Sequence, residues 1–84
     1  MRLTIYSKPG CHLCDEMKST VRRVLSARTA EPAMSVDEID ISGDPALMDR
    51  YGLEIPVLLI DGNKAAKYRV SEQELMQMLD RRRG

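Results

Sequence analysis

The chain has 84 residues, 43% hydrophobic and 31% charged, and its thirteen basic and thirteen acidic side chains give a net charge of zero. This length is enough for one domain with a thin core, because a domain of this size buries only about 60–65% of the surface that its unfolded chain exposes. Three of the basic residues are Arg81, Arg82 and Arg83; the rest of the chain is slightly acidic, which excludes the basic surface typical of a nucleic-acid-binding protein.

The first third of the chain predicts a strand, a turn and a long helix. Residues 2–6 alternate apolar and polar side chains and include β-branched and aromatic types, which favour a strand. Residues 7–10, Ser-Lys-Pro-Gly, have the composition of a turn. The helix is expected to end near Ala27-Arg28, before a loop over residues 29–33. Its apolar residues recur mainly at steps of three and four, which predicts one buried face: Leu13, Met17, Val21, Val24 and Leu25.

The next segment predicts a second strand and a short helix. Residues 34–41 place three β-branched residues among acidic ones and are predicted to form a strand. Asp44 and Pro45 supply an N-cap and a first-turn proline for a helix, and Gly52 supplies its C-terminal stop.

The last third predicts a hairpin and a final helix. Pro56 precedes a third strand at residues 57–60, because proline is tolerated at the first residue of a strand. Residues 61–63, Asp-Gly-Asn, fit a hairpin turn. Residues 64–69 are predicted to form a fourth strand, at an edge that its lysines protect. Residues 71–74, Ser-Glu-Gln-Glu, form a capping box that opens the last helix.

The resulting order β-α-β-α-β-β-α predicts an α/β fold, a four-stranded mixed sheet flanked by three helices, in which the first two strands are parallel. The longest apolar run, residues 57–60, is far shorter than the roughly 20 residues of a membrane-spanning helix. Residues 1–8 lack the apolar stretch of a secretory signal peptide. We therefore expect a cytoplasmic protein without a membrane or nucleic-acid partner.

The two cysteines, Cys11 and Cys14, are spaced C-x-x-C where the first strand leads into the first helix. A disulfide that closes so short a loop stabilises a fold very little. A closed zinc site needs more ligands than the chain offers, since His12 is the only histidine. C-x-x-C beside a β-α-β pattern is instead the signal for thiol–disulfide exchange. The alternative is that both cysteines are small side chains in a helix core.

This order of elements, with C-x-x-C between the first strand and the first helix, resembles the thioredoxin fold. Residues 5–14, Ile-Tyr-Ser-Lys-Pro-Gly-Cys-His-Leu-Cys, are similar to the segment that leads into the C-x-x-C of glutaredoxins. Residues 51–58, Tyr-Gly-Leu-Glu-Ile-Pro-Val-Leu, resemble the segment that carries the cis-proline of this fold. The resemblance to small glutaredoxin-like proteins implies a single domain of thioredoxin-like fold over residues 1–84.

The resemblance also implies a dithiol oxidoreductase that reduces disulfides of proteins or small molecules. Cys11 would attack the substrate disulfide and Cys14 would resolve the mixed disulfide. We expect the pKa of the Cys11 thiol to lie below the value of free cysteine, about 8.5, because a helix N-terminus favours the thiolate. Asp15 could assist proton transfer at Cys14, although an acid in the first turn of a helix is also expected without any function.

Four further residues are expected at the substrate-binding surface. Lys8 and His12 could stabilise the Cys11 thiolate, although each is equally well explained as an ordinary exposed side chain. The resemblance implies that Pro56 is cis and faces the nucleophile, with a trans proline at the start of a strand as the alternative. The backbone of Ile55 would then offer strand-like hydrogen bonds to a substrate segment.

The sequence departs from common glutaredoxins where they bind glutathione. His12-Leu13 stands where dithiol glutaredoxins have Pro-Tyr, and residues 65–71 contain neither the Gly-Gly pair nor the Asp that holds the γ-glutamyl group. We therefore expect no resident cofactor in a monomeric protein. The expected partners are a disulfide-bearing protein or small thiol, and glutathione or a thioredoxin-reductase-type system as the electron donor.

Two functions of other classes fit the same residues. Two subunits could share a metal ion or iron–sulfur cluster through Cys11, since some glutaredoxin-like proteins bind clusters. The disulfide could also switch a binding surface without any catalysis. Anaerobic purification with absorbance and metal analysis separates the cluster protein from the oxidoreductase.

Overall fold

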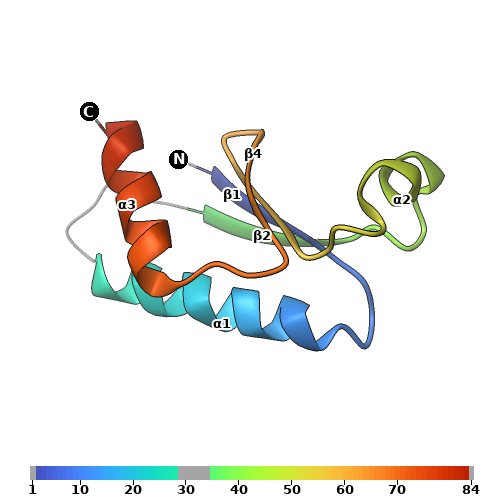
Figure 1. Ribbon diagram of the computed structural model, residues 1–84, viewed down its shortest axis with the longest axis horizontal. Coiled ribbons are helices and arrows are strands. Elements are labelled where there is room, and N and C mark those ends of the chain that lie inside the picture. Colours follow the sequence, from blue (N-terminus) through green and yellow to red (C-terminus); the bar gives the residue numbers. More distant parts are fainter. Residues whose placement is uncertain (1, 29–34, 84) are drawn as a thin grey trace.

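The computed structural model describes residues 2–28 and 35–83 of the chain (Figure 1). The loop predicted over residues 29–33 lies outside these ranges. Within them, no helix has the length and hydropathy needed to span a membrane. The elements follow the predicted order: β1 (Arg2–Ser7), α1 (His12–Ala27), β2 (Ser35–Asp40), α2 (Pro45–Tyr51), β3 (Val57–Ile60), β4 (Asn63–Lys67) and α3 (Glu72–Arg83).

The described strands form a four-stranded sheet in the order β2-β1-β3-β4. β1 runs parallel to β2 and antiparallel to β3, and β3 and β4 are the arms of an antiparallel hairpin. The predicted mixed sheet with a parallel first pair is therefore confirmed. Helices α1 and α3 lie together beside the sheet, while the short α2 stands apart from both (Figure 1).

The core fills the space between one face of the sheet and the helices α1 and α3. β1 alternates between buried and more exposed residues, so that Leu3 and Ile5 point into this space. The apolar stripe predicted for α1 is buried at its centre, while its outer members Leu13 and Leu25 are only partly buried. The buried core side chains are Leu3, Ile5, Met17, Val21, Val24, Leu58, Ile60, Val70, Leu75 and Leu79. This packing fixes α1 against the strand that precedes it.

The hairpin between β3 and β4 forms as predicted, but β4 is shorter than expected. Asp61 and Gly62 have φ values of 51° and 84°, and two successive positive values are what a type I′ hairpin turn requires. The prediction of a strand over residues 64–69 is wrong at its end, because Tyr68 has a φ of 66°. This left-handed conformation is incompatible with an extended strand, so β4 ends at Lys67 and the chain turns toward α1.

The predicted caps of α2 and α3 are both present. The Asp44 carboxylate accepts hydrogen bonds from the backbone N–H groups of Ala46 at 3.1 Å and Leu47 at 3.2 Å. The N–H of Glu74 donates to Ser71 Oγ at 3.0 Å, and the N–H of Ser71 donates to Glu74 Oε1 at 3.1 Å. These reciprocal bonds are the capping box, and they set the residue at which α3 begins.

The core predicts a clear contrast between two leucines. Leu58 is 0% exposed and Leu53 is 93% exposed. We expect Leu58→Ala to lower the free energy of unfolding by about 2–5 kcal/mol, because it removes buried methyl groups and leaves a cavity. Leu53→Ala, the matched control, should change it by less than about 0.5 kcal/mol. Urea denaturation of the two variants measures both values, and equal losses would contradict the described core.

Candidate redox-active site

The two cysteines lie at the start of α1 and are joined by a disulfide, with their Cα atoms 5.2 Å apart. Cys14 belongs to the first turn of the helix and is 1% exposed. Cys11 precedes the helix and is half-buried. The pair therefore presents Cys11 to solvent and keeps Cys14 behind it.

Local backbone geometry places Cys11 at the N-cap of α1. Gly10 has a φ of 75°, which glycine adopts at little cost, and the N–H of Cys11 donates to the carbonyl of Lys8 at 3.3 Å. Cys11 itself is extended, with φ −86° and ψ 109°. Its Sγ accepts a hydrogen bond from the backbone N–H of Cys14 at 3.1 Å. The sulfur thus takes the place that an oxygen of Ser, Asp or Asn occupies in most helices, at the positive end of the helix dipole.

One side of the cysteine pair opens into a hollow with acidic walls, here called the acidic hollow. Of its carboxylates, Asp15 comes from α1 and two come from β2, which the parallel pairing with β1 brings alongside. Hydrogen bonds from the hydroxyl and the backbone N–H of Ser42 hold the pKa of Asp40 below its ordinary value of 3.8. The hollow is lined by Ser7, Lys8, Pro9, Gly10, Cys11, Cys14, Asp15, Glu38 and Asp40.

The carboxylate of Glu38 is fixed within this hollow by two neighbours. The hydroxyl of Ser7, which is itself 4% exposed, donates to Glu38 Oε2 at 3.2 Å. The ammonium of Lys18 on α1 donates to Glu38 Oε1 at 2.9 Å. The hydrogen bond from Lys18, against an opposing effect of burial, holds the pKa of Glu38 below its ordinary value of 4.5. Glu38 is therefore negatively charged at neutral pH beside the cysteine pair.

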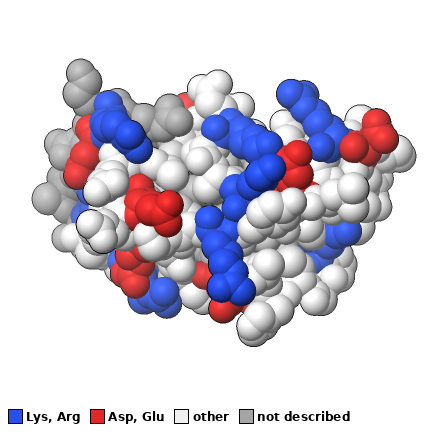
Figure 2. Space-filling view, in the orientation of Figure 1, with Lys and Arg blue, Asp and Glu red and all other residues white. Residues whose placement is uncertain are grey.

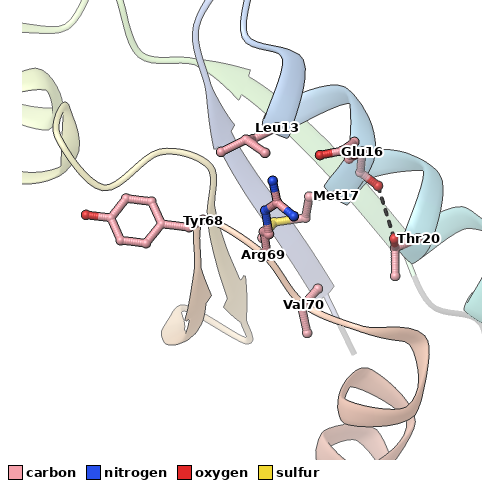
Figure 3. Close-up of a pocket in the computed structure, with 7 residues that line it drawn as sticks. All are labelled: Leu13, Glu16, Met17, Thr20, Tyr68, Arg69 and Val70. Atoms are coloured by element: carbon pink, nitrogen blue, oxygen red, sulfur yellow. Dashed lines mark hydrogen bonds between the residues drawn. The ribbon is translucent and has the colours of Figure 1, made fainter.

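The other side of α1 forms a second pocket, here called the side pocket, with the segment that follows β4 (Figure 3). Leu13, which directly precedes Cys14 in sequence, lies on its α1 wall. In Figure 3, Arg69 extends toward α1, whereas the ring of Tyr68 points away from it. The lining residues are Leu13, Glu16, Met17, Thr20, Tyr68, Arg69 and Val70.

Tyr68 connects this pocket to the segment before β3. Its N–H donates to the carbonyl of Pro56 at 2.8 Å, and its hydroxyl donates to the carbonyl of Leu53 at 3.1 Å. The Ile55–Pro56 peptide bond is cis, as the resemblance implies. Pro56 is buried, and the pairing of Val57 with Tyr6 places it at the end of the sheet where β1 leaves for Cys11.

The structure brings together some of the predicted site residues and separates others. Lys8 shares the acidic hollow with both cysteines. His12 lines neither that hollow nor the side pocket; its side chain is 86% exposed, and its Nε2 lies 3.9 Å from a carboxylate oxygen of Glu16 on the next turn. Ile55 is half-buried before the cis-proline. The substrate contacts expected of these residues stay predictions.

Sequence reasoning missed three residues that shape the site. The sequence predicts Tyr68 and Arg69 inside the fourth strand, but the positive φ of Tyr68 ends the strand and directs Arg69 toward α1. In the sequence, Glu38 is one of several acidic residues in the predicted second strand. Its position beside the cysteines depends on the parallel pairing of β2 with β1. The predicted β-α-β unit is the sequence feature that could have indicated this position.

Comparison with known proteins finds similarity over nearly the whole chain. Residues 2–80 match the family described as Glutaredoxin-like domain (DUF836). A Dictyostelium discoideum protein named Glutaredoxin-like protein YDR286C homolog is 24% identical over 82 residues, covering 95% of this chain and 76% of that protein. The X-ray structure of protein XcR50 from X. campestris matches with a TM-score of 0.68 at 29% identity, covering 94% of this chain and 96% of that one.

A match at lower sequence identity identifies the fold. Thioredoxin 1 from Thermosipho africanus TCF52B has a TM-score of 0.64 at 14% identity, with 98% of this chain and 93% of that chain covered. The thioredoxin-like fold implied by the sequence resemblance is thus confirmed.

The lowered pKa of Glu38 predicts a pH-dependent contribution to stability. A lowered carboxyl pKa stabilises the fold above the ordinary value of 4.5, and this stabilisation is lost as the pH falls through the folded-state value. We expect Glu38→Gln to lower the free energy of unfolding at pH 7 by less than about 1 kcal/mol, since the side chain is partly exposed. The difference from the wild type should shrink as the pH falls below 4.5.

Chemical denaturation between pH 7 and pH 3 measures this difference. Asp49→Asn is the matched control, because Asp49 is exposed and makes no ion pair with the described residues. A Glu38→Gln difference that stays constant across this pH range would contradict the assigned charge state.

Proposed function

The chain belongs to the glutaredoxin-like domain family, and on this premise we propose that it is a dithiol thiol–disulfide oxidoreductase. Cys11 is its nucleophile and Cys14 its resolving thiol. The observation that carries the proposal is the hydrogen bond from the Cys14 N–H to Cys11 Sγ at the start of α1. Once the disulfide is reduced, the same N–H and the helix dipole favour a negative charge on Cys11.

The proposed reaction is an exchange of two electrons and two protons. The Cys11 thiolate attacks one sulfur of a substrate disulfide, forming a Cys11–substrate disulfide and releasing the other substrate sulfur as a thiolate that takes up a proton. Cys14, as its thiolate, then attacks Cys11 Sγ and releases the second substrate thiol. The protein is left with the Cys11–Cys14 disulfide, which is the oxidised state that the structure describes.

The division of roles follows from exposure and helix geometry. The half-buried Cys11 can be reached by a substrate sulfur, whereas Cys14 is only 1% exposed. Their Cα separation of 5.2 Å is within the range of native disulfides, so resolution needs no large backbone movement.

The partners and the setting belong to the same proposal. The substrate is a disulfide of a protein or of a small molecule, and glutathione or a thioredoxin-reductase-type system supplies the electrons in the cytoplasm. Among residues 2–28 and 35–83, no group of three or more His, Cys, Asp and Glu side chains could hold a metal ion. A cluster bridged by Cys11 between two subunits needs a second chain, so that alternative stays a prediction.

Substitution of each cysteine by serine tests the proposal. We expect Cys11→Ser to abolish reduction of a small neutral disulfide such as 2-hydroxyethyl disulfide, because a serine hydroxyl is not ionised at neutral pH. Serine is a good N-cap, so the variant should keep the start of α1. Cys14→Ser should instead accumulate a mixed disulfide on Cys11, since nothing resolves it.

Mass spectrometry of the intact protein after reaction distinguishes the two variants. The wild type should show only the internal disulfide, and Cys14→Ser the mass of one added substrate thiol. Full activity in Cys11→Ser would refute the mechanism.

A further inference from the structure

Basic side chains gather along the edge strand β4 and continue past its end. Lys64, Lys67 and Arg69 are all exposed and are here called the basic band. Figure 2 shows Lys and Arg side chains crossing the molecule over β4 toward α1. Because of the bulge between Leu58 and Leu59, Lys64 pairs with Leu59 and Lys67 pairs with Val57. Val57 and Leu59 point to the same face of the sheet, so the two lysines do so as well. The local backbone therefore aligns these charges.

Two of the three charges in the basic band form no ion pair. Lys64 forms an ion pair with Glu54, whose carboxylate also attracts Lys67 at longer range. The ammonium of Lys67 lies over the ring of Tyr68, 5.5 Å from its centroid. Neither Lys67 nor Arg69 forms an ion pair with any residue in the described part of the chain. Both can therefore pair with an anion from outside.

Arg69 continues this band into the side pocket. It lines the side pocket together with Leu13, one of the two residues between the cysteines in sequence (Figure 3). One carboxylate lines the pocket, that of Glu16. Its Oε1 lies 3.9 Å from Nε2 of His12 on the preceding turn of α1. Hydrogen bonds to the carbonyls of Pro56 and Leu53 hold Tyr68 in its left-handed conformation. This conformation sets the direction of the chain at Arg69, after the end of β4.

The charge on the two sides of α1 is opposite in sign. The acidic hollow holds Asp15 and Asp40, Glu38, whose charge is offset by its ion pair with Lys18, and Lys8. The side pocket and the adjoining band hold Lys67 and Arg69 against Glu16. A substrate segment at Cys11 therefore meets a field that attracts acidic side chains on one side and repels them on the other.

We propose that Lys67, Arg69 and the side pocket are a docking surface for an acidic segment of the disulfide-bearing substrate protein. The inference rests on the proposed function, because it names the substrate class of the same site. A guanidinium can bind a carboxylate with two parallel hydrogen bonds, and Leu13 and Tyr68 offer apolar contact to the rest of the segment. The occupant is a protein segment and not a nucleic acid, because a nucleic acid has no disulfide for Cys11 to reduce.

The inference is tested with peptide disulfides and the fully reduced protein, so that no reductase is needed. Three peptides of equal length each carry one cysteine joined to 2-mercaptoethanol, flanked by two Glu, two Gln or two Lys residues. Each turnover oxidises Cys11 and Cys14 to the disulfide and releases the peptide thiol and 2-mercaptoethanol. Acid-quenched samples separated by chromatography give the rate of peptide release.

We expect the wild type to reduce the Glu peptide about tenfold faster than the Lys peptide at low salt, with the ratio falling toward one as salt screens the charges. Arg69→Glu and Lys67→Glu should each lower this ratio several-fold. Arg81→Glu, the matched control, makes the same charge change near the C-terminal end of α3 and should keep the wild-type ratio.

The outcomes distinguish failure of the docking surface from failure of the proposed oxidoreductase function. Reduction of all three peptides at equal rates, or the same ratio in Arg69→Glu and Arg81→Glu, overturns the docking surface and leaves the oxidoreductase intact. A wild type that reduces neither the peptides nor 2-hydroxyethyl disulfide overturns the proposed function, and the docking surface falls with it.

Discussion

The first backbone N–H groups of α1 have no acceptor within the helix, and one of them, that of Cys14, donates to the sulfur of Cys11. This single contact sets which cysteine is held at the positive end of the helix and which is buried behind it. It depends on the turn at Gly10, which delivers Cys11 in an extended conformation from the central strand β1. The chemistry proposed for the chain follows from this arrangement of one turn and one helix end.

The rest of the molecule fixes the position of that helix end and of the side chains around it. The core between the sheet and α1 and α3 fixes the long axis of α1 against β1. Pairing of β2 with β1 then places the carboxylates of Glu38 and Asp40 on one side of the cysteines. The hairpin of β3 and β4, through Tyr68, places Arg69 in the side pocket on the other side of α1. A small domain with a thin core thus places opposite charges on two sides of the helix that begins at the disulfide.

The sequence predicts the features that depend on neighbours in the chain. The C-x-x-C at a strand–helix junction, the caps at Asp44 and Ser71, and the turn at residues 61–63 follow from residue type and spacing, and the structure confirms them. The left-handed Tyr68 does not follow, because nothing in residues 64–69 marks the end of a strand at Lys67 and the turn is stabilised by the distant carbonyls of Leu53 and Pro56. The hydrogen bonds of Ser7 and Lys18 to Glu38 join β1, α1 and β2, so no pattern of neighbouring residues predicts them.

The central claim is that Cys11, and not Cys14, is the accessible thiolate of the reduced protein. The most direct test treats the reduced protein with limiting iodoacetamide over a range of pH and maps the modified cysteine by peptide mass spectrometry. The account predicts modification almost entirely at Cys11, with a rate whose pH midpoint lies below the value of free cysteine, about 8.5. Equal modification of both cysteines, preference for Cys14, or a midpoint at or above that of free cysteine would contradict it.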